Sequence, residues 1–362
     1  MYITSFQVRD FRNLAHVELE PCKGVNVVFG ENGQGKTNLL EGIWLFTGCR
    51  SFRGADVSEM VMQGKAKAVL DARFVSNGWE QNARLELEEK RALTLGGFAQ
   101  ETPRRMLGVF PAVAFTPGTL ALVQGGPGER RRFLDVALSM LTPAYAVRLS
   151  KYLKALAQRG ALLRQPDPPE DLLDTWDAAL AREAADISAA RLRYMKELIP
   201  RAGEFYAGIS GGREALGLEF KMSGIGYNEE TPPTEETYLA ALRKSRKSDL
   251  RRQTTGLGPH RDDVTLTLDG RCAREFGSQG QQRTAALALK LAEAAMLSAI
   301  TQERPVALLD DVLSELDARR QADLLHYLEG WQVFLTCCEP SHALHGSAGK
   351  VFCVEQGRVQ IK

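Results

Sequence analysis

The chain lacks several features that would assign it to a membrane or secreted class. From Met1 to Phe6 the N-terminus shows no signal-peptide pattern. We find no run of about 18 apolar residues that would predict a membrane-spanning helix. The six cysteines are scattered and form no C-x-x-C pair, so the sequence predicts neither a zinc site nor a disulfide framework. We therefore expect buried thiols in a reducing cytoplasm and no membrane partner.

The chain also lacks a charge imbalance, internal repeats and an aromatic ladder of the kind that grips single-stranded nucleic acid. With 46 basic and 45 acidic residues the net charge is +1, so any polyanion-binding surface must come from local clustering. Apolar residues make up 44% of the 362 residues, which is ample for a globular core. This length suggests two domains, or one domain with a large insertion.

The two ends of the chain and its middle differ in pattern. Short β-branched segments such as Val25–Phe29 predict strands near both ends. The middle is typical of long helices, for example Leu172–Pro200, and proline clusters break them. We therefore predict an α/β head, made of residues 1–116 and 253–362, with a mainly helical domain inserted at residues 117–252.

A glycine-rich loop comes directly after the Val25–Phe29 strand. It fits the pattern G-x-x-x-x-G-K-[ST] at every specified position, and a helix is predicted to begin there. Its backbone N–H groups and the positive end of the helix dipole favour phosphate. Lys36 is expected to reach the β- and γ-phosphates of a nucleotide as a catalytic residue, and the Thr37 hydroxyl to bind Mg²⁺. The predicted nucleotide-binding residues of this loop are Gly30, Glu31, Asn32, Gly33, Gln34, Gly35, Lys36 and Thr37.

A second apolar segment, Val306–Leu309, ends in two acids. A central parallel strand is apolar throughout and opens onto the ligand crevice at its carboxyl end. Asp310 is therefore predicted to hold Mg²⁺, directly or through water, and Asp311 to polarise an attacking water. The alternative is that one of the two acids only caps the following helix.

Ser278 begins the motif S-Q-G-Q-Q at the start of a long predicted helix. Serine is a natural N-cap, and a helix N-terminus with serine and glycine binds anions. Such a site suits a phosphate on another molecule. The alternative is a plain helix cap.

Together these motifs resemble the head of ABC-type ATPases. Ser278–Gln282 is similar to the signature motif, usually L-S-G-G-Q, and Ser314–Asp317 is similar to the D-loop, usually S-A-L-D. Further segments narrow the resemblance to the RecF family, the DNA-repair members of the SMC-like branch of this class. These segments are Phe11–Asn13, Gly125–Asp135 and Gly258–Asp263.

The resemblance implies an ATP-dependent homodimer with ATP and Mg²⁺ as cofactors. In this class two heads sandwich two ATP molecules, and the signature serine of one head meets the γ-phosphate bound by the other. Ser278, as a catalytic and nucleotide-binding residue, and Gly280 and Gln281 would then act across the dimer. Family members bind DNA, assist RecA loading with RecO and RecR, and hydrolyse ATP slowly to reset the dimer. Arg12 is expected to contact the nucleotide, the alternative being a surface arginine.

The chain departs from transport-type ABC ATPases at three positions. Asp311 replaces a glutamate one methylene longer, which fits slow hydrolysis. Thr336 stands where a switch histidine is found, and the nearest histidine is His342. No glutamine follows the predicted strand at Thr116, so Gln124 is the closest candidate for the Q-loop.

Residues 243–252 contain six basic residues and one acid. The pattern favours contact with the DNA backbone without base readout, hence salt-sensitive and sequence-independent binding to duplex or junction DNA. A solvated helix face is the alternative. The predicted DNA-binding residues are Arg243, Lys244, Arg246, Lys247, Arg251 and Arg252. Arg130 lies in a second basic run, where the sequence indicates an internal salt bridge at least as strongly as a contact with DNA.

Three other functions share part of this pattern. A transporter's ATPase subunit has a similar head, but the helical insertion and the missing switch histidine argue against it. An SMC protein needs a far longer coiled coil, which the proline clusters would break. A P-loop kinase would need neither a signature helix nor a D-loop and would act as a monomer, so an ATP-dependent change of mass in solution separates it from the dimeric class.

Overall fold

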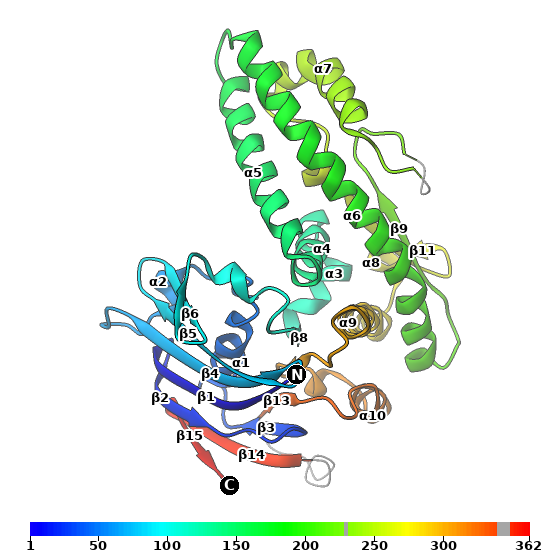
Figure 1. Ribbon diagram of the computed structural model, residues 1–362. Helices are drawn as coiled ribbons and strands as arrows, with labels where there is room; N and C mark the ends of the chain where they lie inside the picture. The colour runs from blue at the N-terminus through cyan, green and yellow to red at the C-terminus, as the bar shows by residue number, and fades with distance from the viewer. Residues whose placement is uncertain (228–230, 339–347) are drawn as a thin grey trace. The chain divides into compact units, whose positions relative to one another are not determined.

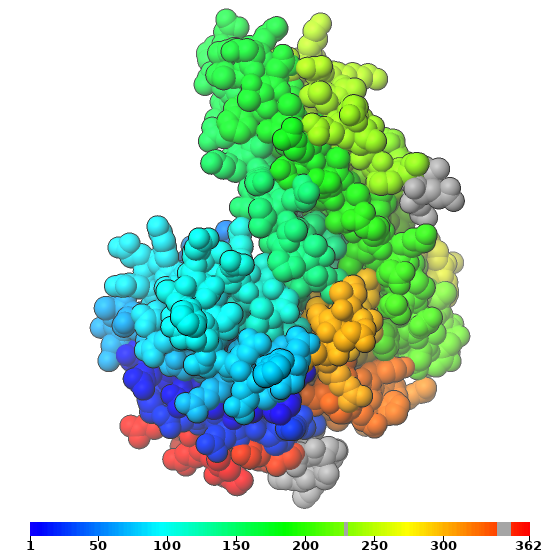
Figure 2. All heavy atoms as spheres, in the orientation of Figure 1, coloured from blue at the N-terminus to red at the C-terminus, as the bar shows by residue number. Residues whose placement is uncertain are grey.

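The computed structural model describes residues 1–227, 231–338 and 348–362 (Figure 1). The chain divides into two units. The head comprises Met1–Thr119 and Lys290–Lys362, and the arm comprises Leu120–Leu289. On the surface of the head, residues from the two ends of the chain lie side by side, blue beside red in Figure 2. The two ends therefore fold together, as the sequence predicts.

An antiparallel sheet forms one layer of the head. Its strand order is β2-β1-β4-β5-β6-β7. Buried and accessible residues largely alternate along its strands, so one face packs on the core. Asn77 and Gly78, both with positive φ, form the tight turn between β4 and β5. The strands are β1 (Tyr2–Phe11), β2 (Leu14–Leu19), β4 (Ala68–Ser76), β5 (Trp79–Leu87), β6 (Arg91–Leu95) and β7 (Phe98–Gln100).

A second, mainly parallel sheet carries the nucleotide motifs. Its order is β15-β14-β3-β13-β12-β8, with only β15 antiparallel to its neighbour. Strands β8 and β12 are buried along their whole length, which explains their continuous apolar sequences. The carboxyl ends of β3, β13 and β12 therefore meet at one edge of the sheet. The strands are β3 (Val25–Phe29), β8 (Ala112–Phe115), β12 (Val306–Leu309), β13 (Val333–Cys337), β14 (Ala348–Glu355) and β15 (Arg358–Ile361).

Helix α1 (Lys36–Leu45) lies between these two sheets and packs against β1 and β13. It is buried along almost its whole length, including Leu39, Ile43 and Trp44, so it forms the centre of the head's core. Its first residue is the P-loop lysine, which means that the core fixes the orientation of that loop. The other α-helices of the head are α2 (Val57–Met60), the last part of α9 (Gln279–Thr301) and α10 (Ala318–Tyr327), and its short 3₁₀ helices are η1 (Pro103–Met106), η2 (Pro117–Leu120) and η4 (Leu313–Glu315).

The arm is built on two long helices and a third that packs against them. Helix α5 packs along α6, and α6 along α7. The Pro166–Pro169 cluster separates α5 from α6. The elements are α3 (Ala121–Gln124), α4 (Pro127–Leu141), α5 (Pro143–Leu163), α6 (Glu170–Ser210), β9 (Leu216–Lys221), α7 (Glu235–Arg252), η3 (Pro259–Arg261), β10 (Asp263–Leu268), β11 (Arg271–Cys272), α8 (Ala273–Phe276) and the first part of α9 (Gln279–Thr301).

Two details of the arm differ from the sequence-based expectation. Helix α6 continues through Pro200 to Ser210, because Ala202, Tyr206 and Ile209 extend its buried face beyond the proline. The arm also extends to Leu289 rather than ending at residue 252. Strand β9 lies inside the predicted helical insertion and pairs with β10, so this pairing attaches the segment after α7 to the arm.

Helix α9 is the one described helix that is long and apolar enough to cross a membrane by length and composition. In this structure 72% of its most apolar window is buried inside the protein, as in the core helix of a globular protein.

Candidate nucleotide-binding site

The phosphate-binding loop connects β3 to α1, in the strand–loop–helix arrangement that the motif requires. Gly30 and Gly35 have φ angles of 154° and 118°. A Cβ atom on Gly30 would lie 2.2 Å from the Val354 carbonyl oxygen, and one on Gly35 would lie 2.7 Å from Asn13 Oδ1. Both positions therefore require glycine. Gly33 has open space around it and is needed only for its backbone conformation.

Lys36 places its ammonium inside this loop. The side chain is largely buried, and Nζ donates to the carbonyl oxygens of Gly30 and Glu31. Its Nζ also lies 3.9 Å from the Cys338 sulfur. A cation held by loop carbonyls is positioned to meet the phosphates of a nucleotide.

Asp310 and Thr37 are in direct contact, so the structure brings together the two residues predicted to hold a metal. Thr37 Oγ1 donates to Asp310 Oδ1 at 2.9 Å, and Thr336 Oγ1 donates to the same oxygen at 2.9 Å. Burial raises the pKa of Asp310, and the two hydroxyl donors oppose that rise.

A hydroxyl and a carboxylate are hard oxygen ligands, which suit Mg²⁺. Among the described residues no group of three His, Cys, Asp or Glu side chains could hold a metal on its own. Mg²⁺ at Thr37 and Asp310 would therefore depend on nucleotide phosphates for part of its coordination, as is usual for this ion.

Asp311 is the next residue and adopts a left-handed backbone conformation with φ of 51°, which is uncommon outside glycine. Its N–H donates to Thr336 Oγ1 at 2.8 Å, and its carbonyl accepts from Ser314 Oγ at 2.7 Å. Ser314 belongs to the predicted D-loop. The backbone around Asp311 is thus fixed on both sides, while its side chain stays partly accessible.

Arg12 forms an ion pair that sequence reasoning missed. Its guanidinium donates twice to Glu41, with both N–O distances at 3.0 Å, and once to the Glu59 carbonyl at 2.8 Å. Glu41 is fully buried in α1 and also accepts a hydrogen bond from Ser51. An acid at a buried helix position is the one signal in the sequence that pointed to this pair. The nucleotide contact of Arg12 remains a prediction.

Asn13 was likewise missed as a site residue. Its Nδ2 donates to the Gly33 carbonyl at 3.0 Å, and its Oδ1 accepts from Asn38 Nδ2 at 2.8 Å. It therefore connects the phosphate-binding loop to the first turn of α1. The motif F-R-N, which contributed to the family resemblance, supplies both Arg12 and Asn13.

The signature motif lies in the arm. Ser278 is exposed, its Oγ accepts from the Gln281 N–H at 3.3 Å, and its N–H donates to Gln281 Oε1 at 2.6 Å. This reciprocal pair is a capping box with glutamine as the fourth residue. Gln281 Nε2 also donates to Glu214 at 2.7 Å. Gly280 occupies the first turn of α9 between them.

Gln282 holds the signature motif in place through side-chain hydrogen bonds. Its buried side chain donates to the carbonyls of Ala273, Arg274 and Gly277. Its Oε1 accepts from Gln124 Nε2 at 2.7 Å. Gln124, the candidate Q-loop residue, therefore contacts the residue that supports the signature motif.

Most of the basic residues of α7 are exposed, namely Arg243, Lys244, Lys247, Arg251 and Arg252. Arg246 differs, because its Nη2 is bound to Asp174 and Asp177 of α6 at 2.7 and 2.6 Å. Arg243 lies 3.6 Å from the same Asp174. The predicted DNA-binding set thus contains two arginines, Arg246 and Arg243, that form ion pairs within the arm.

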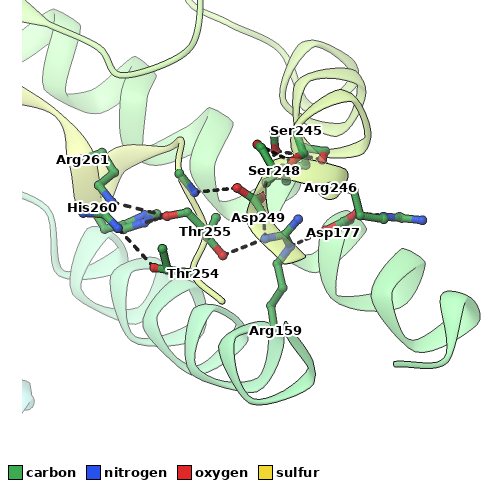
Figure 3. Close-up of polar contacts among 12 residues, drawn as sticks. Arg159, Asp177, Ser245, Arg246, Ser248, Asp249, Thr254, Thr255, His260 and Arg261 are labelled. Atoms are coloured by element: carbon green, nitrogen blue, oxygen red, sulfur yellow. Dashed lines mark hydrogen bonds and ion pairs between the residues drawn. The ribbon is translucent and has the colours of Figure 1, made fainter. Parts of the chain in front are cut away.

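A buried polar cluster holds the end of α7 in place (Figure 3). Arg159 of α5 donates to Asp177 at 2.6 Å, to Asp249 of α7 at 2.9 Å and to Thr255 at 2.8 Å. All four residues are almost inaccessible to solvent. Charged groups therefore connect α7 to α5 and α6 at this end. They lie beside an apolar cluster in which Leu250 of α7 packs against Leu162, Leu163 and Leu173.

The structure also shows the positions of Arg130 and Thr336, two residues that the sequence singled out. Arg130 donates twice to Asp263, at 2.7 and 3.0 Å, so it forms the internal salt bridge that its sequence context indicated. Thr336 lies near the carboxyl end of β13, the strand between β3 and β12. It stands at the position where the sequence predicts a threonine instead of the switch histidine of transport-type proteins. His342 lies outside the described residues.

Comparison with known proteins finds relatives of one kind that cover almost the whole chain. A family model described as RecF/RecN/SMC N terminal domain matches residues 2–99. The DNA replication and repair protein RecF of Symbiobacterium thermophilum is 38% identical over 347 residues, covering 94% of this chain and 92% of the relative. RecF of Gloeobacter violaceus is 37% identical, covering 99% of this chain and 98% of the relative.

Solved structures give the same result. The recombination mediator protein RecF with ATP, described as part of the RecFOR pathway, matches with a TM-score of 0.92 at 34% identity, over 100% of this chain and 97% of that one. The corresponding RecF-ATPrS structure has a TM-score of 0.91 at 34% identity, over 99% and 98% of the two chains. An Smc head domain from Pyrococcus furiosus matches with a TM-score of 0.57 at 15% identity, over 100% and 96% of the chains, which shows the fold alone. The predicted ABC-type head fold with an SMC-like character is confirmed.

Proposed function

The chain belongs to the RecF family of DNA replication and repair proteins, and from this premise we propose that it is an ATP-dependent DNA-binding protein of recombinational repair. ATP brings two copies together on DNA, slow and DNA-stimulated hydrolysis separates them, and the cycle assists RecA loading with RecO and RecR in the cytoplasm. The observation that carries this proposal is the contact between Thr37 and Asp310, which unites the phosphate-binding loop and the acid-ended strand in one site.

ATP binding would use the loop from Gly30 to Thr37, whose N–H groups and Lys36 ammonium suit a triphosphate. Thr37 and Asp310 would hold Mg²⁺, which when bound neutralises charge on the phosphates. Asp311 would orient the attacking water. Its carboxylate is one methylene shorter than glutamate, so it would hold that water less closely, which fits the slow turnover of a switch.

Dimerisation would complete the site. Ser278 is exposed at the start of α9, and its backbone conformation is fixed by the capping box. An exposed and rigid helix N-terminus is suited to a phosphate on a second molecule. We infer that Ser278, Gly280 and Gln281 of one copy meet the γ-phosphate bound by Lys36 and Thr37 of the other.

DNA binding would use the exposed side of α7. Its five exposed cations are interspersed with serines and belong to one helix, which suits phosphate contacts along a duplex or gap junction without base readout. Binding should therefore weaken steeply with salt. Arg246 is not counted among the direct contacts of the free protein, because Asp174 and Asp177 occupy it.

The experiment that tests this function is light scattering at several protein concentrations, with ATP–Mg²⁺, ADP–Mg²⁺ or no nucleotide, each with and without a short duplex. A doubling of mass with ATP alone, with the duplex bound by the dimer, is expected. A protein that stays monomeric under all six conditions would contradict the composite site and favour a P-loop kinase or another monomeric enzyme.

A further inference from the structure

Among the described residues, Thr336 has a side chain that hydrogen-bonds to both members of the acid pair. It lies on β13, the strand between β3 and β12, and its side chain is 1% exposed. Its hydroxyl donates to Asp310 Oδ1 at 2.9 Å and accepts from the Asp311 N–H at 2.8 Å. Because β13 separates β3 from β12, a side chain near its carboxyl end lies between the phosphate-binding loop and the two acids.

These two bonds need a group that donates and accepts at once. A hydroxyl has one donor and two acceptor sites, so Thr336 satisfies Asp310 and Asp311 simultaneously. Because the Thr336 hydroxyl donates its proton to Asp310, the direction of its oxygen lone pairs is fixed. One of these lone pairs accepts the hydrogen bond from the Asp311 N–H. Valine has the same shape as threonine and can form neither bond, whereas serine can form both.

The consequence for Asp310 is a fixed orientation. Its Oδ1 accepts from two hydroxyls, Thr37 on one side and Thr336 on the other. Outer hydrogen bonds of this kind hold a metal-binding carboxylate in place. If the Thr37 hydroxyl moved toward a bound metal, the bond from Thr336 would still orient the carboxylate.

The consequence for Asp311 is a fixed backbone. A φ of 51° is unfavourable for a residue with a side chain and persists only where the surroundings hold it. Thr336 holds the N–H of Asp311 and Ser314 holds its carbonyl. This conformation turns the chain sharply between two consecutive acids, so that one is buried against Thr37 while the next remains accessible.

We propose that Thr336 is a positioning residue for ATP hydrolysis, one hydroxyl that sets both the metal-binding acid and the acid that orients water. The proposal rests on the function proposed above for Asp310 and Asp311. It assigns to this position a role different from that of a histidine, because Thr336 acts through the two acids rather than on the phosphate.

The test compares Thr336→Val with Thr336→Ser, using two measurements on the full-length protein. The first is the affinity for Mn²⁺ in the presence of ADP, followed by electron paramagnetic resonance. The second is single-turnover hydrolysis of ATP at saturating protein. We expect Thr336→Val to weaken Mn²⁺ binding and to slow hydrolysis, each by about tenfold or more, as for other residues that support a metal ligand. Thr336→Ser should restore both.

A parallel variant, Asp310→Asn, separates the two ways in which the idea can fail. If Asp310→Asn weakens Mn²⁺ binding and Thr336→Val does not, the role of Thr336 is wrong and the site stands. If Asp310→Asn leaves Mn²⁺ binding unchanged, the site itself is wrong. Thr336→Ala provides a smaller side chain should the valine variant fail to fold, and it should show the same losses. Circular dichroism at matched concentrations checks the fold of each variant.

Discussion

At the scale of single residues, Arg159 is a charge buried in a helical core, where apolar side chains are usual. It contacts one carboxylate on α6 and one on α7, and its Nη2 has no hydrogen-bond partner among the described residues. Arg159→Met would leave Asp177 and Asp249 with fewer partners in a buried site. We expect a loss of about 3–5 kcal/mol of arm stability, measured by urea denaturation. Arg164→Met, at an exposed position one turn later, should cost far less; equal losses would contradict this role.

His260 gives the arm a dependence on pH. Its Nδ1 lies 2.6 Å from the Tyr152 hydroxyl and its Nε2 lies 3.1 Å from the Thr255 carbonyl. Burial lowers the pKa of His260 from 6.5 to about 4. The unfolded chain therefore binds a proton that the folded arm excludes, and stability falls as the pH drops from about 6.5 toward 4.

We expect His260→Gln to remove about 2 kcal/mol of the stability difference between about pH 7.5 and pH 5, measured by urea denaturation at both values. His16→Gln, at an exposed position outside the arm, is the control for the loss of a histidine. A His260 variant with the same pH dependence as the wild type would show that this ring is protonated in the folded protein.

A substitution at Lys36 tests the role of the phosphate-binding loop in ATP hydrolysis. Lys36→Arg keeps the positive charge, but guanidinium is planar and its donors form a fixed fork, unlike a compact ammonium that fits between the carbonyls of Gly30 and Glu31. We expect ATP binding to weaken modestly and hydrolysis to fall by about 100-fold or more, as when a transition-state contact is lost. Lys65→Arg is the exposed control. Wild-type turnover by Lys36→Arg would remove this loop from the mechanism.

At the scale of elements, α7 presents its cations next to an acid on α6. Asp174 pairs with Arg246 at 2.7 Å and lies 3.6 Å from Arg243, and the bond from Arg246 lowers its pKa. If α7 contacts DNA, Asp174 competes with phosphate for these two arginines. We expect Asp174→Asn to raise duplex affinity about threefold and to steepen the salt dependence by about one unit of slope.

Fluorescence anisotropy with a labelled duplex at several salt concentrations measures both quantities. Asp171→Asn makes the same change of charge one turn earlier on α6. An identical gain from both variants would show a general effect of net charge, and no gain from either, with α7 alanine variants also neutral, would exclude α7 from the interface.

The elements themselves could be predicted to different degrees. Strand β3, the loop and α1 follow from patterns within about 20 residues, because glycine, lysine and apolar spacing act locally. Strand β9 could not be predicted in the middle of a helical segment, because it forms by pairing with β10, which lies beyond α7 in the chain. The continuation of α6 past Pro200 depends on burial of Tyr206, and burial is not a local property.

At the scale of the whole molecule, the residues of the candidate nucleotide site also differ in whether local sequence could predict them. The sequence alone could predict Lys36, Thr37 and Asp310, because each belongs to a motif whose chemistry is local. The contact between Thr37 and Asp310 joins residues 273 positions apart, and only the order of strands in the sheet brings them together. Glu41 carries no motif, and the sequence located Thr336 only at the switch-histidine position. Their contacts with Arg12 and with the two acids therefore appear only with the fold.

The last prediction concerns two copies of the chain. Ser278 is exposed, belongs to the arm and forms its capping bonds with Gln281, whereas the phosphate-binding loop belongs to the head. We expect Ser278→Arg to bind ATP as the wild type does, by equilibrium dialysis, and to stay monomeric with ATP by light scattering, because arginine fills the space where a second copy's γ-phosphate would lie. Ser150→Arg makes the same change at an exposed position on α5 and should dimerise normally. If Ser278→Arg still dimerised with ATP, the two copies would have to meet elsewhere, and the signature motif would be only a helix cap.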